Sequence, residues 1–135
     1  MTQEDKELLL KDLCARLPYR VVCKCYHTEF NEWDGEPFVA EYDDILENID
    51  AIGNCLAGGF SYDIEEFKPY LRPMSSMTEE EYKEYYKTFR AESYGRGYVY
   101  VESVKSFDWL NKHHFDYRGL IEKGLALEAP KGMYN

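Results

Sequence analysis

One long interval of the chain restricts its possible folds more than any other feature. From Cys25 to Phe67 there is no lysine or arginine, and twelve of these 43 residues are acidic. Burying carboxylates that have no positive partner is costly, so this interval must be largely exposed to water. We therefore expect it to form surface rather than core.

The net charge of −10 is concentrated in the same part of the chain. Residues 1–67 carry a balance of −11, whereas residues 68–135 carry a balance of +1. A negative field repels nucleic acid and anionic membranes and attracts basic partners, so we expect no direct nucleic-acid partner and no membrane partner. Two interpretations stay open, a surface that keeps the protein soluble or a face that binds a basic protein surface. The candidate binding residues of that face are Glu41, Asp43, Asp44 and Glu47.

The first part of the chain predicts a helix followed by a strand. Thr2 is a suitable N-cap with Asp5 as its capping-box acid, and the helix is expected over residues 3–16. Its apolar stripe consists of Leu9, Leu10, Leu13, Cys14 and Leu17. A strand follows over residues 19–28, with alternate residues on one face. Those residues are Val21, Cys23, Cys25 and His27.

Further strands are expected in the acidic interval. Asp34 and Gly35 predict a turn into a second strand over residues 36–42. Residues 43–52 fit either a continuation of that strand or a short helix, and residues 55–62 predict a third strand. Several short strands after one helix predict a small, curved antiparallel sheet of three to five strands.

Two prolines indicate a junction over residues 68–77, because Pro69 and Pro73 prevent regular helix there. The junction divides the chain into residues 1–70, with the first helix and the sheet, and residues 71–135, which are mainly helical. Both parts are expected to form one unit. The predicted fold class is therefore α+β, with an N-terminal helix, the small sheet and two or three C-terminal helices.

The C-terminal helices are expected at three places. Thr78 and Glu81 form a capping box for a helix that continues to Gly95, and residues 98–101 predict a brief strand. Ser103 then caps a second helix. A last short helical turn is expected from Asp116 to Gly124, followed by an extended tail over residues 125–135. The apolar stripe of the second helix is Val104, Phe107, Leu110 and His114.

The first of these helices carries an aromatic stripe at helical spacing. A stripe of this kind could stack nucleic-acid bases, but a single-strand binder also needs a basic groove, which this half does not have. We therefore expect the stripe to lie in the core or in an interface, including an interface between copies of the chain. It consists of Tyr82, Tyr85, Tyr86 and Phe89.

Two thiols and an imidazole share one face of the first predicted strand, but their spacing does not favour a metal. Structural zinc sites use pairs of cysteines separated by two to four residues, whereas Cys23 and Cys25 are separated by one. Cys14 and Cys55 are isolated. We expect Cys23 and Cys25 to be small core residues, and we expect neither a metal nor a cofactor.

The densest group of reactive side chains lies near residues 108–118. His113 or His114 could act as a general base, Asp108 or Asp116 could orient it, and Arg118 could bind an anion. No nucleophile or complete triad accompanies them. The structural interpretation is that His114 packs in the core, that Asp116 caps a helix and that Arg118 pairs with an acid.

Three blocks of the sequence, residues 6–19, 68–81 and 108–130, resemble a family of short acidic proteins from gut-bacterial genomes and their phages and prophages. The resemblance implies a mobile-element context and assigns no activity or site residue. The acidic N-terminus lacks the features of a secretory signal, so a cytoplasmic protein is expected.

These observations lead to three hypotheses about function. The first is a non-enzymatic interaction protein of phage or prophage character, whose acidic face binds a basic surface of a host protein. The second is a small enzyme centred on His113, His114 and Asp116. The third is a structural or assembly accessory protein that associates through the aromatic stripe.

Overall fold

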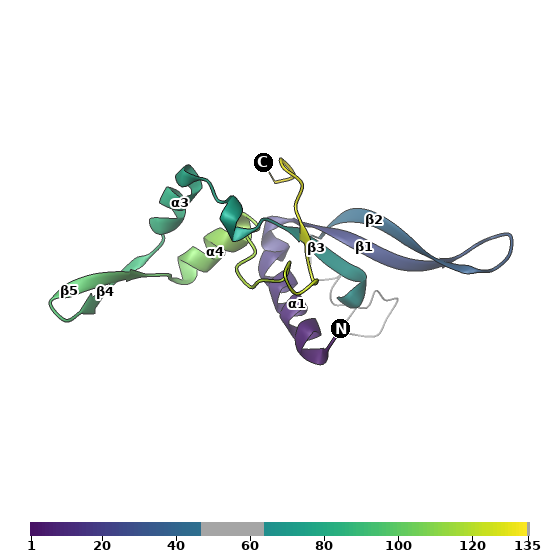
Figure 1. Ribbon diagram of the computed structural model, residues 1–135, viewed down its shortest axis with the longest axis horizontal. Coiled ribbons are helices and arrows are strands. Elements are labelled where there is room, and N and C mark those ends of the chain that lie inside the picture. Colours follow the sequence, from purple (N-terminus) through teal and green to yellow (C-terminus); the bar gives the residue numbers. More distant parts are fainter. Residues whose placement is uncertain (47–63, 135) are drawn as a thin grey trace.

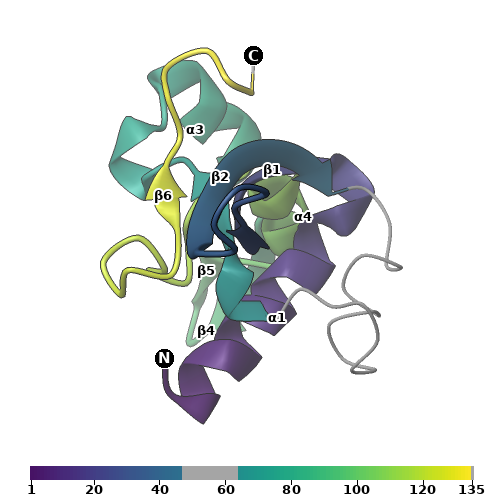
Figure 2. The same cartoon turned by 90° about the vertical axis from the view of Figure 1, so that its right-hand side faces the viewer.

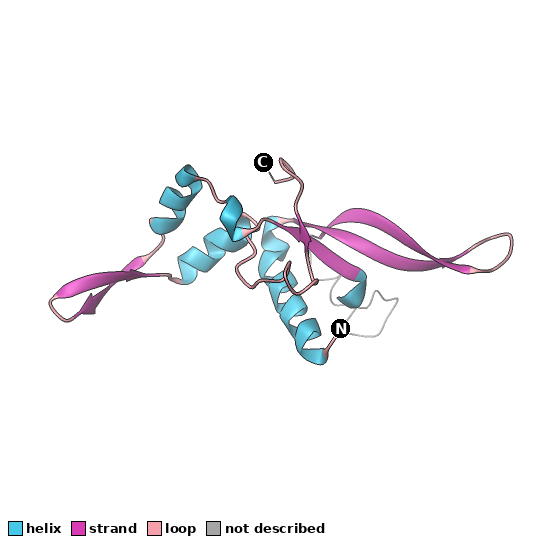
Figure 3. Ribbon diagram, viewed as in Figure 1, coloured by secondary structure: helices cyan, strands magenta, loops and turns pink. Residues whose placement is uncertain are grey.

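The molecule consists of a central body from which two β-hairpins project in opposite directions (Figure 1). The computed structural model describes residues 1–46 and 64–134. The body combines helices with a four-stranded mixed sheet, and a separate two-stranded sheet forms one of the hairpins (Figure 3). The α+β class expected from the sequence is confirmed.

Helix α1 (Gln3–Arg16) has the predicted limits. The Thr2 hydroxyl accepts a hydrogen bond from the Asp5 N–H at 3.1 Å, and the Asp5 carboxylate accepts one from the Thr2 N–H at 3.4 Å. Leu9 and Leu13 are fully buried, as the apolar stripe predicts. Cys14 is exposed, and the buried face of the helix instead includes the ion pair of Asp12 and Arg16.

The main sheet has the strand order β2-β1-β3-β6. Its strands are β1 (Val21–Phe30), β2 (Pro37–Leu46), β3 (Phe67–Leu71) and β6 (Leu127–Glu128). The first three pair antiparallel, but β6 runs parallel to β3, so the expectation of a purely antiparallel sheet is wrong for this strand. Figure 2 shows the strong curvature of β1 and β2.

The register of β1 and β2 is set by the predicted alternation and the predicted turn. Residues pair from Val21 opposite Leu46 to Phe30 opposite Pro37, and Gly35 occupies the turn with φ of 71°. Residues 43–46 continue β2. For this described part of residues 43–52, strand continuation is therefore confirmed and the short helix is wrong. The strand expected over residues 55–62 lies outside the described residues.

Strand β3 lies in the segment that the prolines mark as a junction. Pro69 is fully buried opposite Cys23 of β1. Proline favours extended geometry in the residue before it, and a strand requires that geometry. The prolines therefore exclude helix here, as expected, without excluding a strand.

Helix α3 (Glu79–Tyr86) begins at the predicted capping box of Thr78 and Glu81 but ends well before Gly95. The Thr88 hydroxyl bonds to the Tyr85 carbonyl just after its last turn. The chain then forms the hairpin of β4 (Arg90–Tyr94) and β5 (Gly97–Val101), with Gly95 in the turn at φ of 59°. The brief strand expected near residue 98 is confirmed, whereas the predicted extension of the helix to Gly95 is wrong.

Helix α4 (Val104–Lys112) follows Ser103, as predicted. Leu110 is fully buried, but Val104 and Phe107 are exposed, so only part of the expected stripe faces the core. The segment from Asp116 to Gly124 forms turns instead of the expected short helix. Short 3₁₀ helices occupy Leu17–Tyr19, Ile64–Glu66 and Met74–Ser76.

Among the residues that the structure describes, the core has two parts. The larger lies between α1 and the sheet and includes Leu9, Leu13, Val21, Cys23 and Leu71. The smaller consists of Tyr85, Leu110 and Phe115 with the aromatic rings around them.

A buried ion network joins α1 to the C-terminal segment. Arg16 donates two hydrogen bonds to the Asp12 carboxylate, at 2.8 and 3.1 Å, and a third to the Phe115 carbonyl at 2.6 Å. Arg118 also donates to Asp12, at 3.1 Å. Asp12 and Arg16 are fully buried, so α1 is fixed to the C-terminal segment by charge as well as by apolar packing.

Candidate functional site

The outer half of the β1–β2 hairpin is the candidate binding site, and we call residues 26–41 the acidic arm. Strand β3 pairs with β1 only from Cys23 to Cys25. Beyond Cys25, no other described strand pairs with the two long strands, and the hairpin that they form leaves the body (Figure 1). The arm contains five carboxylates and no lysine or arginine. The carboxylates belong to Glu29, Glu32, Asp34, Glu36 and Glu41.

The tip of the arm is held by hydrogen bonds within the turn. The Asn31 side chain accepts from the Trp33 N–H, and the Asp34 side chain accepts from the Glu36 N–H, both at 2.9 Å. The Asn31 N–H also donates to the Glu36 carbonyl at 2.9 Å. These bonds fix the backbone of the turn that carries the tryptophan.

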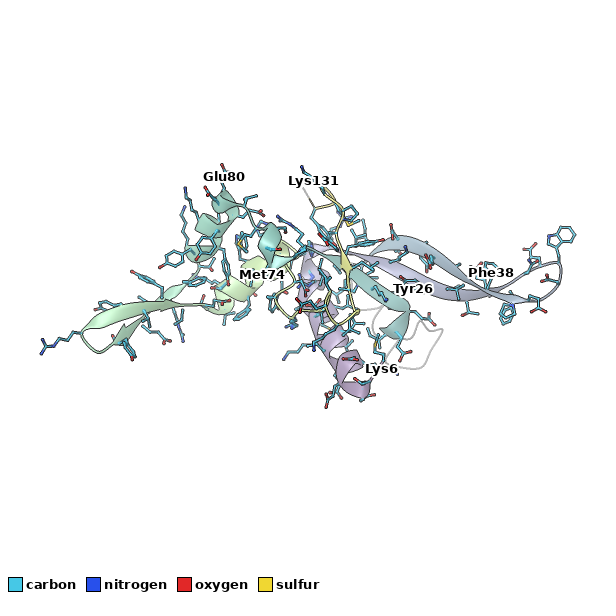
Figure 4. The ribbon with its side chains drawn as sticks, in the orientation of Figure 1. Lys6, Tyr26, Phe38, Met74, Glu80 and Lys131 are labelled. Carbon is cyan, nitrogen blue, oxygen red and sulfur yellow. The ribbon has the colours of Figure 1, made fainter. Side chains whose placement is uncertain are left out.

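Large apolar side chains are exposed at this tip. Trp33 is 95% exposed and Phe30 is 68% exposed. Phe38 lies on the second strand of the arm and is also exposed (Figure 4). Residue-level analysis of the sequence missed these aromatics. The sequence signal that could have identified them is their position on either side of the turn at Asp34, within the interval that contains no lysine or arginine.

The four acids proposed from the sequence do not form one patch. Glu41 and Asp43 share a face, where Lys24 lies 3.4 Å from Glu41 and the Tyr70 hydroxyl donates to Asp43 at 2.9 Å. Asp44 points to the opposite face because successive strand residues alternate. Glu47 lies outside the described residues. The exposed acids near Trp33 are therefore better placed to meet a partner.

The proposed catalytic side chains are engaged in separate structural contacts. The His113 ring packs on Trp109 with centroids 4.2 Å apart, and the His114 ring packs on Tyr134 at 4.0 Å. Asp116 accepts from the N–H groups of Leu120 and Ile121, at 2.8 and 3.0 Å. Arg118 binds Asp12. A cavity of about 480 Å³ is lined by Asp116 but by neither histidine nor Arg118.

Burial determines the protonation of His114. Burial, together with the nearby charge of Arg16, lowers the pKa of this imidazole to about 4. His114 Nε2 lies 3.1 Å from the Tyr19 carbonyl. A carbonyl only accepts, so Nε2 carries the proton and His114 is a neutral donor in the core. The pKa of His113 is also lowered, mainly by burial.

Cys23 and Cys25 of β1 are free thiols in the core, on the face of the strand that alternation predicts. Burial raises the pKa of Cys23, and burial with the charge of Asp44 raises the pKa of Cys25 to about 11. Within residues 1–46 and 64–134, no three His, Cys, Asp or Glu side chains gather in a way that could hold a metal ion.

Alkylation should distinguish these thiols from the exposed Cys14. The pKa of Cys25 is about two units above its ordinary value, which alone reduces its thiolate fraction about 100-fold. We expect Cys23 and Cys25 to react at least about 100-fold more slowly than Cys14 with iodoacetamide, as followed by peptide mass spectrometry. The difference should disappear in denaturant. Equal rates in the folded protein would contradict the buried placement.

The aromatic stripe is only partly buried. Tyr85 lies in the core beside Trp109, whereas Tyr82 and Tyr86 are exposed and stack on each other at 6.2 Å. Met74, Met77, Tyr82 and Tyr85 line an apolar cavity of about 510 Å³. Glu80 of α3 points away from the body (Figure 4).

Comparison of the chain with protein-family models, curated proteins and solved structures found no match. Among the described residues, no helix has the length and apolar character needed to cross a membrane.

Proposed function

We propose that this chain is a non-enzymatic interaction protein whose acidic arm binds a basic protein surface. The observation that carries the proposal is the exposure of Trp33 and Phe30 at the end of a projecting hairpin that has no positive side chain. Monomeric proteins rarely expose grouped apolar side chains without a binding role, and tryptophan is enriched among residues that dominate binding energy. The surrounding carboxylates favour a basic partner.

The hairpin geometry suits this role. The hydrogen bonds in the turn already order the backbone that carries Trp33 before a partner binds. Less conformational entropy is then lost on association. The five carboxylates would increase the association rate with a basic partner and would discriminate against acidic ones. Glu41 is partly neutralised by Lys24, so the outer acids would contribute most.

An enzyme centred on His113, His114 and Asp116 is less favoured, because each of these side chains already has a structural contact. The proposed setting is the cytoplasm of a bacterial host of phages or prophages. That setting is based on the resemblance of three sequence blocks and on the acidic N-terminus.

The proposal can be tested by crosslinking followed by titration. A photoreactive amino acid at position 33 is used to capture a partner in bacterial cells, and the purified partner is then titrated against the wild-type chain by calorimetry. We expect Trp33→Ala to weaken this binding at least tenfold, because a central tryptophan contributes about 2 kcal/mol or more. The affinity should also fall as salt concentration rises.

The matched control is Tyr94→Ala, which removes an exposed aromatic from the tip of the other hairpin. It should change the affinity less than twofold. An acidic partner, or equal losses for the Trp33 and Tyr94 variants, would refute binding through the acidic arm.

A further inference from the structure

The second projecting hairpin has an unprotected strand edge. We call residues 90–101 the tyrosine hairpin; it extends from the end of the molecule opposite the acidic arm (Figure 1). Tyr98 is 71% exposed and Tyr100 is 57% exposed, and Tyr100 packs on Tyr86 of α3 at 5.7 Å. Within the part of the chain that the structure describes, no strand pairs with the outer edge of β5. A two-stranded hairpin of this kind gains stability from further strands.

The two edges of the tyrosine hairpin differ in how they are protected. Natural edge strands avoid unwanted pairing through charges, prolines or bulges. Strand β4 carries Arg90 and Glu92, whereas β5 has no charged residue and no proline. The outer edge of β5 is therefore the edge best suited to pair with another strand.

We propose that two copies of this chain associate through the outer edges of β5, antiparallel, with Val99 on the two-fold axis. The sequence Tyr98-Val99-Tyr100 reads the same in both directions. In this register each Tyr98 lies opposite Tyr100 of the second copy, and the two Val99 residues face each other. Both aromatic pairs lie on one face, and cross-strand aromatic pairs stabilise a sheet.

The backbone of β5 fits the same register. The hairpin has a two-residue turn flanked by Tyr94 and Gly97. Because hydrogen-bonded and non-bonded pairs alternate in an antiparallel ladder, Val99 directs its N–H and C=O toward β4. Tyr98 and Tyr100 direct theirs outward. In the proposed pairing, the outward N–H and C=O groups of Tyr98 lie opposite those of Tyr100 in the second copy. Each of these groups can therefore form a hydrogen bond between the two copies.

Charge favours this end of the molecule over the other. Two acidic arms would repel each other, because each carries five carboxylates and no base. The tyrosine hairpin carries Arg90 and Arg96 against Glu92, and its β5 edge is uncharged. The dimer is closed by its two-fold symmetry and leaves an acidic arm at each far end. A second copy is therefore a better occupant of this edge than a strongly basic partner.

The experiment is sedimentation velocity of the full chain over a range of concentrations. The wild type is expected to shift from monomer to dimer as concentration rises. Val99→Lys and Val99→Glu each place two like charges together at the two-fold axis, so each should weaken dimerisation at least tenfold. An equimolar mixture of the two variants should restore the dimer, because every pair of facing residues can then be lysine opposite glutamate.

The mixture also shows that the variants remain folded, since an unfolded hairpin could not restore pairing. The control is Ile45→Lys, a comparable change at an exposed apolar residue of β2 outside the acidic arm, which should leave dimerisation unchanged. A wild type that remains monomeric at every concentration would overturn the proposal. Assembly beyond the dimer, or a mixture of Val99 variants that stays monomeric, would overturn it as well.

Discussion

Replacing Asp12 with alanine is expected to lower the free energy of unfolding by about 3–5 kcal/mol. Asp12 is fully buried and accepts hydrogen bonds from both Arg16 and Arg118. Its removal leaves the buried guanidinium of Arg16 without an anion, and the desolvation of that charge is no longer offset. Urea unfolding followed by far-UV circular dichroism measures the change.

The matched control is Glu7→Ala, because Glu7 lies on the same helix and is exposed. This change should stay within about 0.5 kcal/mol of the wild type. If Asp12→Ala were equally mild, Asp12 and Arg16 would have to be accessible to water, which would contradict the position of α1 against the C-terminal segment.

Acidification from pH 7 to pH 5 is expected to cost about 2 kcal/mol of stability through His114. Its pKa is about 4 in the folded protein and about 6.5 in the unfolded chain. The unfolded chain therefore binds a proton at a higher pH than the native state does. The contribution is complete above pH 6.5 and is lost as the pH falls from about 6.5 to about 4. Urea unfolding at both pH values measures it.

His114→Asn isolates this contribution, since asparagine tolerates the left-handed backbone of this position, where φ is 61°. We expect most of the stability difference between pH 7 and pH 5 to disappear in the variant, with a smaller part left for His113. Glu81 affects stability only at a lower pH. The pKa of its carboxyl is lowered to about 2, mainly by the hydrogen bonds from Arg72, so its contribution to the free energy of unfolding is lost as the pH falls below about 4.5. An unchanged pH dependence in His114→Asn would contradict a buried neutral imidazole.

Local signals predicted the parts of the fold that depend on neighbours in sequence. The capping boxes at Thr2 and Thr78 begin their helices as expected. The alternation from Val21 placed Cys23 and Cys25 in the core, and the turn at Gly35 set the register of β1 and β2. These features involve hydrogen bonds and side-chain periods that span only a few residues, so a single sequence contains them.

Predictions failed where distant segments decide the structure. The parallel pairing of β6 with β3 joins residues far apart in the chain, and so does the bond from Arg16 to the Phe115 carbonyl. The helix after Thr78 ends at Tyr86, and the residues that follow form a hairpin whose Tyr100 packs on Tyr86. The two long-range contacts have no signal within a short window of sequence, whereas the hairpin has a partial one in Gly95 and in the strand expected near residue 98.

For the candidate site, the sequence by itself determined the charge of the acidic arm and the positions of its aromatics. Only the tertiary structure decided that β3 is too short to cover β1 beyond Cys25, so that these residues extend into solvent. The same applies to His114. The sequence places it in a reactive cluster, whereas stacking on Tyr134 and a hydrogen bond to the Tyr19 carbonyl make it a buried neutral donor. Charge is a property of composition, whereas exposure and pKa depend on which distant residues exclude water.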